Sequence, residues 1–401
     1  MKNGVKTAKY FLIVMSLIVI FCKAGITHNG ITKSYVHYTM KTMTVNPFHP
    51  VMAISLAVIK NGQIILCDTV GYAQVNKTLA DNDTKYRIAS ISKLITAIAA
   101  WQLIESGKLN PDADVNDYLD VKLRNPDYPD IPITTTMLMS HTSSISDGTM
   151  SNEAPGTCFH YDNKNYDLLA TIIEKVSGER FDKYMTAHIF KPMELTCSFN
   201  ISDMNKETQS HIGTLYRKCD SEGRYAPLIG EWTAQADDGV TLKTYDDYVT
   251  GTDASIFGSA GGLRISINEL CQIAQMFMNG GKYNGVKILK PSSVQKMFTP
   301  IWTGGNKDDL IRCYGMGTHI FTNTGGDCLV KKQNLPFAGH LAEAHGLLAG
   351  FVIDYTKGNG IIYIIAGLGS NPHKYRGDYS ALYKWEEQLL TIGAEYGNFE
   401  Y

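Results

Sequence analysis

Ser90 and Lys93 lie one helical turn apart at the start of an apolar segment that runs to Trp101. Residues three apart share one face of a helix, so the Lys93 amine can reach the Ser90 hydroxyl and take its proton. The free N–H groups and the positive dipole end of a first helical turn favour an alkoxide or oxyanion. Apolar neighbours such as Ile95 are expected to lower the pKa of Lys93 from about 10.4 towards neutrality. The pair therefore predicts an activated serine nucleophile.

Spacing alone does not identify this pair, because Ser293 and Lys296 repeat it. The second pair begins a short polar helix, where we expect a capping serine and a solvated lysine. Ser90 by itself also fits a plain helix cap. The apolar helix behind Ser90 favours the first pair.

Tyr161 and Asn163 form a second chemical group, just before a helical pattern that begins at Tyr166. A phenol near an ammonium ionises more easily than a free tyrosine and can pass a proton between the serine and a leaving group. The Asn163 amide can donate to a substrate carbonyl while accepting from Lys93. Tyr396 and Asn398 have the same spacing, so this pattern is also weak by itself.

The elements that must position these residues have a clear order along the chain. Strand patterns at 53–59 and 63–67 surround the turn Asn61-Gly62, and a second strand pair is expected at 348–354 and 360–366. Helices are expected at 94–106, 166–177, 180–189, 267–278 and about 380–394. The stretch from 213 to 262 has little periodicity and fits a lid, a substrate wall or a surface insertion.

This order predicts an α+β fold, in which both chain ends build one antiparallel sheet, flanked by helices, and a mainly helical lobe is inserted. The α/β lobe is expected at about 45–95 and 255–401, and the helical lobe at about 96–254. Both belong to one hydrolase domain, residues 25–401.

Seven further segments support a family resemblance. In these segments and in the run from Arg87 to Lys93, the chain resembles the serine β-lactamase and penicillin-binding-protein superfamily, specifically its class C-like branch. The resemblance extends from about Pro50 to the end and implies a β-lactamase/transpeptidase-like fold. The segments are 104–109, 115–119, 137–143, 161–163, 177–181, 190–193 and 259–263.

The resemblance also implies a third motif, which we place at His340-Leu341-Ala342, with an alanine where the family usually has glycine. The added methyl group would narrow the site. Ser90 and Glu343 would supply the two backbone N–H groups of an oxyanion hole. An alternative register places Ala344-His345-Gly346 in the motif.

His340 would orient a substrate as a histidine that titrates near pH 6.5. The resemblance then implies a serine hydrolase that forms an acyl-enzyme on D-amino-acid-containing peptides, amides or esters, similar to a D-alanyl-D-alanine carboxypeptidase. Alternatives within the fold are a β-lactamase and an esterase for small esters. An alternative from another functional class is a binding protein, a weakly active paralogue that binds peptidoglycan or penicillin. The expected partners are small molecules or peptides, including a peptidoglycan stem peptide or a β-lactam.

The N-terminus has three lysines before an apolar run from Tyr10 to Phe21. This run is about 12 residues long, whereas a helix that spans a membrane needs about 20. The run therefore predicts a signal peptide at residues 1–24. We therefore expect export to the periplasm or outside the cell. Attachment to the envelope would arise only through an uncleaved N-terminal segment.

The remaining composition excludes several classes of function. The net charge of −2 and the dispersed basic residues predict no nucleic-acid partner. No Cys-x-x-Cys motif occurs, so neither a metal site nor a cofactor is expected. The seven cysteines after Cys22 are an odd number; Cys197 with Cys219, or Cys313 with Cys328, could form disulfides.

Overall fold

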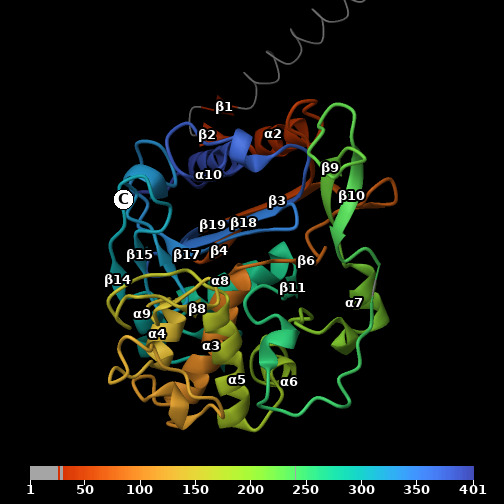
Figure 1. Cartoon of the computed structure of the whole chain (residues 1–401). Helices are drawn as coiled ribbons and strands as arrows, with labels where there is room; N and C mark the ends of the chain where they lie inside the picture. Colours follow the sequence, from red (N-terminus) through yellow and green to blue (C-terminus); the bar gives the residue numbers. More distant parts are fainter. Residues whose placement is uncertain (1–25, 28–29, 240) are drawn as a thin grey trace, which may run out of the picture.

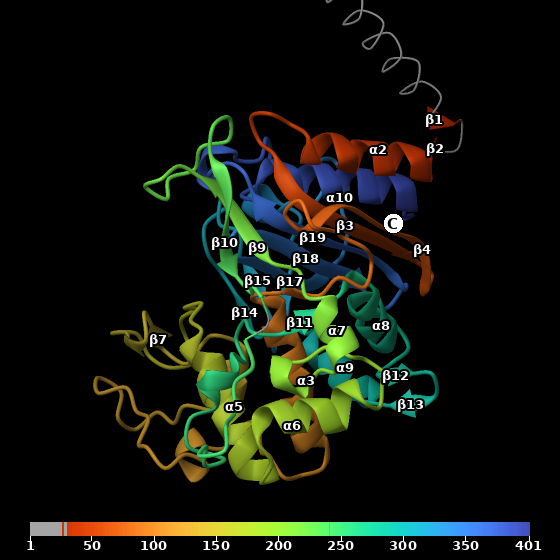
Figure 2. The same cartoon turned by 90° about the vertical axis from the view of Figure 1, so that its right-hand side faces the viewer.

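A large antiparallel sheet separates a pair of helices from a mainly helical lobe (Figures 1 and 2). A computed structural model describes residues 26–27, 30–239 and 241–401. The predicted signal peptide lies outside the described residues. No helix in the described part of the chain is both long and apolar enough to cross a membrane.

Five long strands form the centre of this sheet, in the order β17-β18-β19-β3-β4. The first and last parts of the chain meet where β19 pairs with β3, so both chain ends build the sheet as predicted. The strands are β3 (Val51–Lys60), β4 (Gln63–Gln74), β17 (Ala338–Ala344), β18 (Leu347–Asp354) and β19 (Asn359–Leu368).

The turn between β3 and β4 is the predicted Asn61-Gly62 pair, with φ angles of 51° and 76°. Positive φ at both central residues is the geometry that a two-residue hairpin requires. The local sequence therefore sets the pairing of these two strands.

Shorter strands extend the sheet, and one hairpin was not predicted. β9 (Leu215–Cys219) and β10 (Glu231–Ala236) pair with each other, and β9 joins β19. They lie in the stretch that showed little periodicity. The large sheet also contains β5 (Thr78–Leu79), β14 (Trp302–Thr303), β15 (Cys313–Tyr314) and β16 (His319–Ile320). The other short strands form separate antiparallel pairs: β1 (Ile26–Thr27) with β2 (Gly30–Ile31), β6 (Tyr86–Arg87) with β11 (Arg264–Ile265), β7 (Ile145–Ser146) with β8 (Thr149–Met150), and β12 (Lys282–Tyr283) with β13 (Val286–Lys287).

Two helices cover one face of the sheet, α2 (Lys33–Thr44) and α10 (Lys384–Gly397) (Figure 1). They bury an apolar layer against the sheet that includes Met40 and Trp385. The C-terminal helix was predicted but begins four residues later, and α2 was not predicted. With its mixed polar composition, α2 depends on packing against the sheet rather than on local propensity.

The helical lobe packs on the other face around a second core (Figure 2). Its main helices are α3 (Ile91–Glu105) and α5 (Lys164–Ser177). Helix α8 (Ile267–Met278) packs directly on this face of the sheet, and its bounds are those predicted. The predicted helix at 180–189 is α6 followed by a π-helical turn, Thr186–Phe190. The remaining helices are α4 (Thr135–Met139), α6 (Phe181–Met185), α7 (Lys206–Ser210) and α9 (Pro291–Met297).

The seven cysteines in the described part of the chain are all free thiols. The two suggested disulfides, Cys197 with Cys219 and Cys313 with Cys328, are therefore absent from this structure.

A buried ion pair fixes the strand that leads into Ser90. The Lys85 ammonium, directly before β6, lies 2.6 Å from a carboxylate oxygen of Glu269 on α8, and both side chains are less than 10% exposed. Glu269 also accepts from the N–H groups of Thr196 and Ser266. One carboxylate thus connects three segments beneath the start of α3.

We expect Lys85→Met to lower the free energy of unfolding by about 3–5 kcal/mol, because it leaves the Glu269 carboxylate buried without its cation. Lys384→Met, which removes the exposed pair with Asp378, should cost at most about 1 kcal/mol. Urea denaturation measures both. Equal losses in the two variants would contradict a special role for the buried pair.

Candidate active site

Ser90 lies immediately before α3, at its N-cap position, but its side chain does not cap the helix. The preceding Ala89 has a φ of 48°, a backbone conformation that residues with a Cβ rarely adopt. This sharp bend brings the chain from β6 into the helix. The plain-cap interpretation of Ser90 is wrong, because its hydroxyl faces Lys93 instead.

Lys93 is completely buried, and its amine has three oxygen neighbours. The Lys93 Nζ atom lies 3.2 Å from Ser90 Oγ, 2.7 Å from Asn163 Oδ1 and 2.8 Å from the carbonyl oxygen of Ala260. Burial lowers the pKa of Lys93 to about 7, although the carboxylates of Asp167 and Asp162 oppose the shift. The amine can therefore lose its proton near neutral pH.

These three contacts determine where the lone pair of a neutral amine points. The oxygens of Asn163 and Ala260 only accept hydrogen bonds, so they take the two N–H groups of the uncharged Lys93 amine. The remaining position, towards Ser90 Oγ, is left for the lone pair. Deprotonated Lys93 can thus accept the Ser90 proton.

Tyr161 and Asn163 come from the loop that leads into α5. Asn163 is the N-cap residue of this helix, and its side chain accepts from Lys93 instead of capping. The Tyr161 ring centre lies 4.9 Å from Lys93 Nζ, and its ring packs against His141 with centroids 4.4 Å apart. His141 holds this loop by accepting from the backbone N–H of Asp162.

The expected easy ionisation of Tyr161 was wrong. Burial of the hydroxyl raises the pKa of the Tyr161 phenol, and a hydrogen bond with Ser90 only partly opposes this. The neighbouring Lys93 amine has a pKa of about 7, so it is only about half protonated at pH 7 and offers only part of a positive charge to a phenolate. Tyr161 is therefore a protonated hydroxyl beside the serine.

His340 lies on β17, and the protein occupies both of its ring nitrogens. Its Nδ1 atom is 2.6 Å from the carbonyl oxygen of Leu341, and its Nε2 atom is 2.9 Å from the Tyr314 hydroxyl. A carbonyl only accepts, so Nδ1 carries the proton and Nε2 accepts from Tyr314. Burial, with a smaller contribution from Lys93, lowers the pKa of His340 to about 3. The expected titration near pH 6.5 was wrong, and this corner of the site is uncharged.

The second possible register of the third motif forms a turn. His345 and Gly346 connect β17 to β18 with φ angles of 54° and 80°, so only Ala344 of this alternative motif lies on β17. Ala342 is buried and packs into the same core as α3. The alanine methyl group is therefore accommodated within the packing of the helical lobe.

One cavity of about 310 Å³ brings most of the predicted residues together, including Ser90, Tyr161, His340 and Glu343. β16 pairs with only the first two residues of β17, which leaves the edge beyond Gly339 open to this cavity. Ser90 and Glu343 thus line the same cavity.

Sequence reasoning missed three contributors to the site. The Ala260 carbonyl contacts Lys93, Tyr314 fixes His340, and the exposed Arg376 lines the cavity. Ala260 lies in a segment that carried the family resemblance, which was a usable signal. Nothing in the local sequence distinguishes Tyr314 or Arg376.

The second Ser-x-x-Lys and Tyr-x-Asn matches lie away from the cavity that Ser90 lines. Ser293 is inside α9 rather than at its cap, and Lys296 lies over the Trp101 ring. Tyr396 and Asn398 are at the end of α10, on the other face of the sheet.

Comparison with known proteins agrees with this geometry. Residues 48–383 match the family model described as Beta-lactamase. The chain belongs to the beta-lactamase family. The predicted superfamily and α+β fold are therefore confirmed, and the protein has the fold of a family of serine hydrolases.

Two bacterial relatives match parts of the chain. Protein flp of Staphylococcus aureus (strain N315) is 31% identical over 183 residues, 40% of this chain and 37% of that protein. The putative penicillin-binding protein PbpX of Bacillus subtilis (strain 168) is 28% identical over 283 residues, 66% of this chain and 61% of that protein. The matches thus span less than two thirds of these relatives.

Solved structures share the fold at lower identity. The octameric penicillin-binding protein homologue from Pyrococcus abyssi has a TM-score of 0.64 and 22% identity, over 85% of this chain and 74% of that chain. The D-amino acid amidase from Ochrobactrum anthropi SV3, complexed with D-phenylalanine, has a TM-score of 0.64 and 17% identity, over 92% of this chain and 99% of that chain.

The buried amine predicts the pH dependence of the site. We expect kcat/KM for a p-nitrophenyl ester to rise from pH 5.5 to 8.5 with a midpoint near 7, because Lys93 becomes a base as it loses its proton. Lys93→Arg should lose about 10²–10⁴-fold in rate, since a guanidinium keeps its proton. A pH profile that is flat over this range would contradict a base of this pKa.

Proposed function

We propose that this protein is a serine acyl hydrolase that acts on amides or esters of D-amino acids. Ser90 is the nucleophile, Lys93 is its base, and Tyr161 and Asn163 complete the site. The observation that carries this proposal is the Lys93 amine, whose N–H groups are taken by two carbonyl oxygens while its lone pair faces Ser90 Oγ.

The first half of the reaction acylates Ser90. Its oxygen attacks the substrate carbonyl carbon as its proton passes to Lys93, and the collapsing intermediate expels an amine or alcohol. Lys93 returns the proton to that leaving group through the Tyr161 hydroxyl, which hydrogen-bonds Ser90. Water then attacks the acyl carbonyl as one of its protons passes to Lys93. The bond to Ser90 Oγ breaks, Lys93 returns the proton to that oxygen, and the acid product leaves.

Two backbone N–H groups are proposed to hold the oxyanion, those of Ser90 and Glu343. The first lies at the positive end of the α3 dipole, and the second lies on the open part of β17. The Asn163 amide nitrogen remains for the substrate carbonyl, because its oxygen is engaged by Lys93.

The neutral His340 favours a substrate without a free carboxylate beside it. A substrate carboxylate beside His340 would lose its hydrating water without forming an ion pair. Both ring nitrogens of His340 are already hydrogen-bonded, and the pKa of His340 is far below neutral. An amide or ester has no such charge. The same preference is consistent with the similarity in fold to a D-amino acid amidase.

We expect the wild-type protein to hydrolyse D-amino-acid amides or p-nitrophenyl esters, and Ser90→Ala to reduce kcat by about 10³-fold or more, because the acyl-enzyme cannot form. Mass spectrometry of trapped intermediates should place the acyl group on Ser90. The matched control is Ser293→Ala, which removes the serine of the second Ser-x-x-Lys pair. Undiminished hydrolysis or labelling in Ser90→Ala would contradict the proposal.

A D-alanyl-D-alanine carboxypeptidase remains the second candidate, because Arg376 lines the same cavity. Its guanidinium lies over the Tyr383 ring and could bind a terminal carboxylate there. In that case Arg376→Gln should raise KM for D-Ala-D-Ala peptides about tenfold and leave KM for the corresponding amide unchanged. Equal changes for both substrates would exclude this candidate.

Turnover measurements also distinguish a β-lactamase from a penicillin-binding paralogue. Sustained turnover of nitrocefin would indicate a β-lactamase, whereas a single acylation event without turnover of any substrate would indicate a penicillin-binding paralogue.

We further propose that the reaction takes place outside the cytoplasm, because the N-terminal segment has the basic and apolar pattern of a signal peptide.

A further inference from the structure

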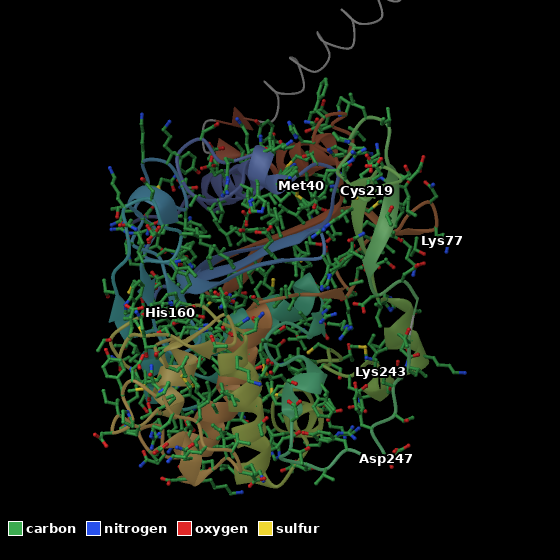
Figure 3. The ribbon with its side chains drawn as sticks, viewed as in Figure 1. Met40, Lys77, His160, Cys219, Lys243 and Asp247 are labelled. Carbon is green, nitrogen blue, oxygen red and sulfur yellow. The ribbon has the colours of Figure 1, made fainter. Side chains whose placement is uncertain are left out.

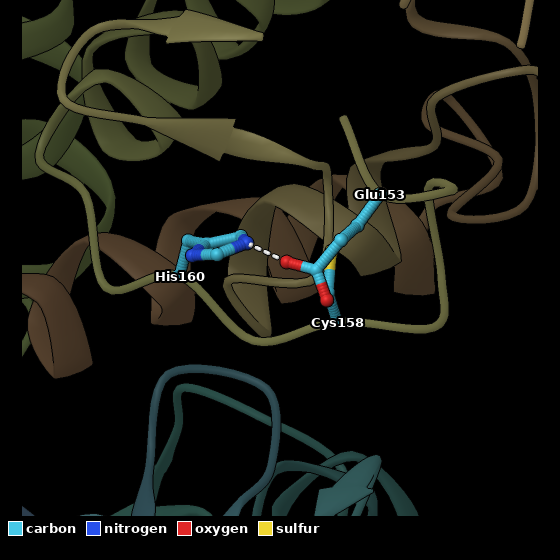
Figure 4. Close-up of side chains that lie close together, drawn as sticks. All are labelled: Glu153, Cys158 and His160. Atoms are coloured by element: carbon cyan, nitrogen blue, oxygen red, sulfur yellow. Dashed lines mark hydrogen bonds and ion pairs between the residues drawn. The ribbon is translucent and has the colours of Figure 1, made fainter. Parts of the chain in front are cut away.

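Three side chains that can bind a transition metal converge on the loop before Tyr161. They are Glu153, Cys158 and His160, and one ligand atom of each lies within 4.8 Å of the others. Figure 4 shows the Glu153 carboxylate and the His160 ring pointing towards each other, with Cys158 beside them. Within the described residues, no other group of three such ligands lies this close together.

The backbone of this loop is anchored on both sides of the cluster. The Glu153 carbonyl accepts from the Asn125 amide and the Ser144 hydroxyl, at 3.1 and 2.6 Å. The His160 N–H donates to the carbonyl oxygen of His141 at 2.9 Å. Backbone contacts thus hold Glu153 and His160, and their side chains meet at 2.7 Å. The Cys158 thiol donates to the carbonyl oxygen of Ala154 at 3.7 Å.

The cluster is open to solvent on one side. The Glu153 side chain is 52% exposed and that of His160 is 27% exposed, while Cys158 is buried beneath them. His160 lies at the level where the helical lobe meets the sheet (Figure 3). An ion can thus enter from solvent and reach the thiol at the floor of the cluster.

We propose that Glu153, Cys158 and His160 bind a divalent transition-metal ion of the zinc type, with water as a fourth ligand. Thiolate and imidazole together favour such ions, whereas magnesium and calcium prefer oxygen ligands alone. Ligand atoms around zinc lie about 3.3–3.8 Å apart. The His160 Nε2 and Glu153 Oε2 atoms, now 2.7 Å apart, would therefore separate slightly, and ligand atoms up to 4.8 Å apart would move closer together. The Cys158 thiol gives up its proton to solvent as the metal–sulfur bond forms.

Sequence reasoning found no metal site because the ligands do not follow a familiar spacing. Cys158 and His160 are separated by one residue and Glu153 lies five residues earlier, so only the folded loop brings them together. The site is distinct from the acyl-transfer residues but adjoins them, because His160 directly precedes Tyr161. A bound ion would hold the loop on which Tyr161 stands.

Titration of the purified, reduced protein with cobalt(II) alone tests this proposal. We expect one equivalent to bind, with a thiolate-to-cobalt absorption band that excess zinc(II) removes. Cys158→Ser should abolish the band, and Glu153→Gln and His160→Ala should each weaken cobalt binding tenfold or more. Glu153→Gln alters an exposed side chain, so its effect does not depend on a change in folding.

Two matched variants serve as controls. His188→Ala removes an exposed histidine that pairs with Glu179 at 2.8 Å but lies in no three-ligand cluster of the described chain, and Cys328→Ser removes a thiol elsewhere. Both should bind cobalt(II) as the wild type does. The proposal is overturned if the wild type shows no thiolate band, or if Cys158→Ser keeps it.

Discussion

The arrangement of the site depends on an amine buried without a partner charge in contact with it. Lys93 is enclosed by the helical lobe, and its hydrogen-bond partners are a hydroxyl, an amide oxygen and a backbone carbonyl. None of these neutralises an ammonium, so burial favours the uncharged form. A lysine on the surface would keep its proton at neutral pH, whereas Lys93 can lose its proton near pH 7 because the fold buries it.

Three segments distant in sequence meet at that amine. The start of α3 contributes Ser90, the start of α5 contributes Asn163, and the loop before β11 contributes Ala260. Both helix starts use residues whose side chains do not cap their own helix. The two helices thus give up a local stabilising contact of about 1 kcal/mol each, and the side chains serve the site instead.

Local sequence predicted the elements whose pattern is self-contained. Asn61-Gly62 specifies its hairpin through backbone conformation, and α8 begins with a capping box at Ser266, so both were predictable. The hairpin β9–β10 and helix α2 were missed, because pairing and packing with distant parts of the chain stabilise them. The grouping of Ser90, Lys93 and Asn163 was predicted from spacing and resemblance, whereas the low pKa of His340 results mainly from its burial by distant parts of the chain.

The two-residue turn His345-Gly346 also fixes which way β17 faces. Successive side chains on a strand point to opposite faces, so an insertion of one residue in this turn would exchange the two faces of β17 relative to β18. His340 and Ala342 would then turn towards α10, and Leu341 and Glu343 would turn towards α3. The length of this turn, in which His345 is exposed and Gly346 is buried, thus decides which side chains of the third motif face the side of the sheet on which Ser90 lies.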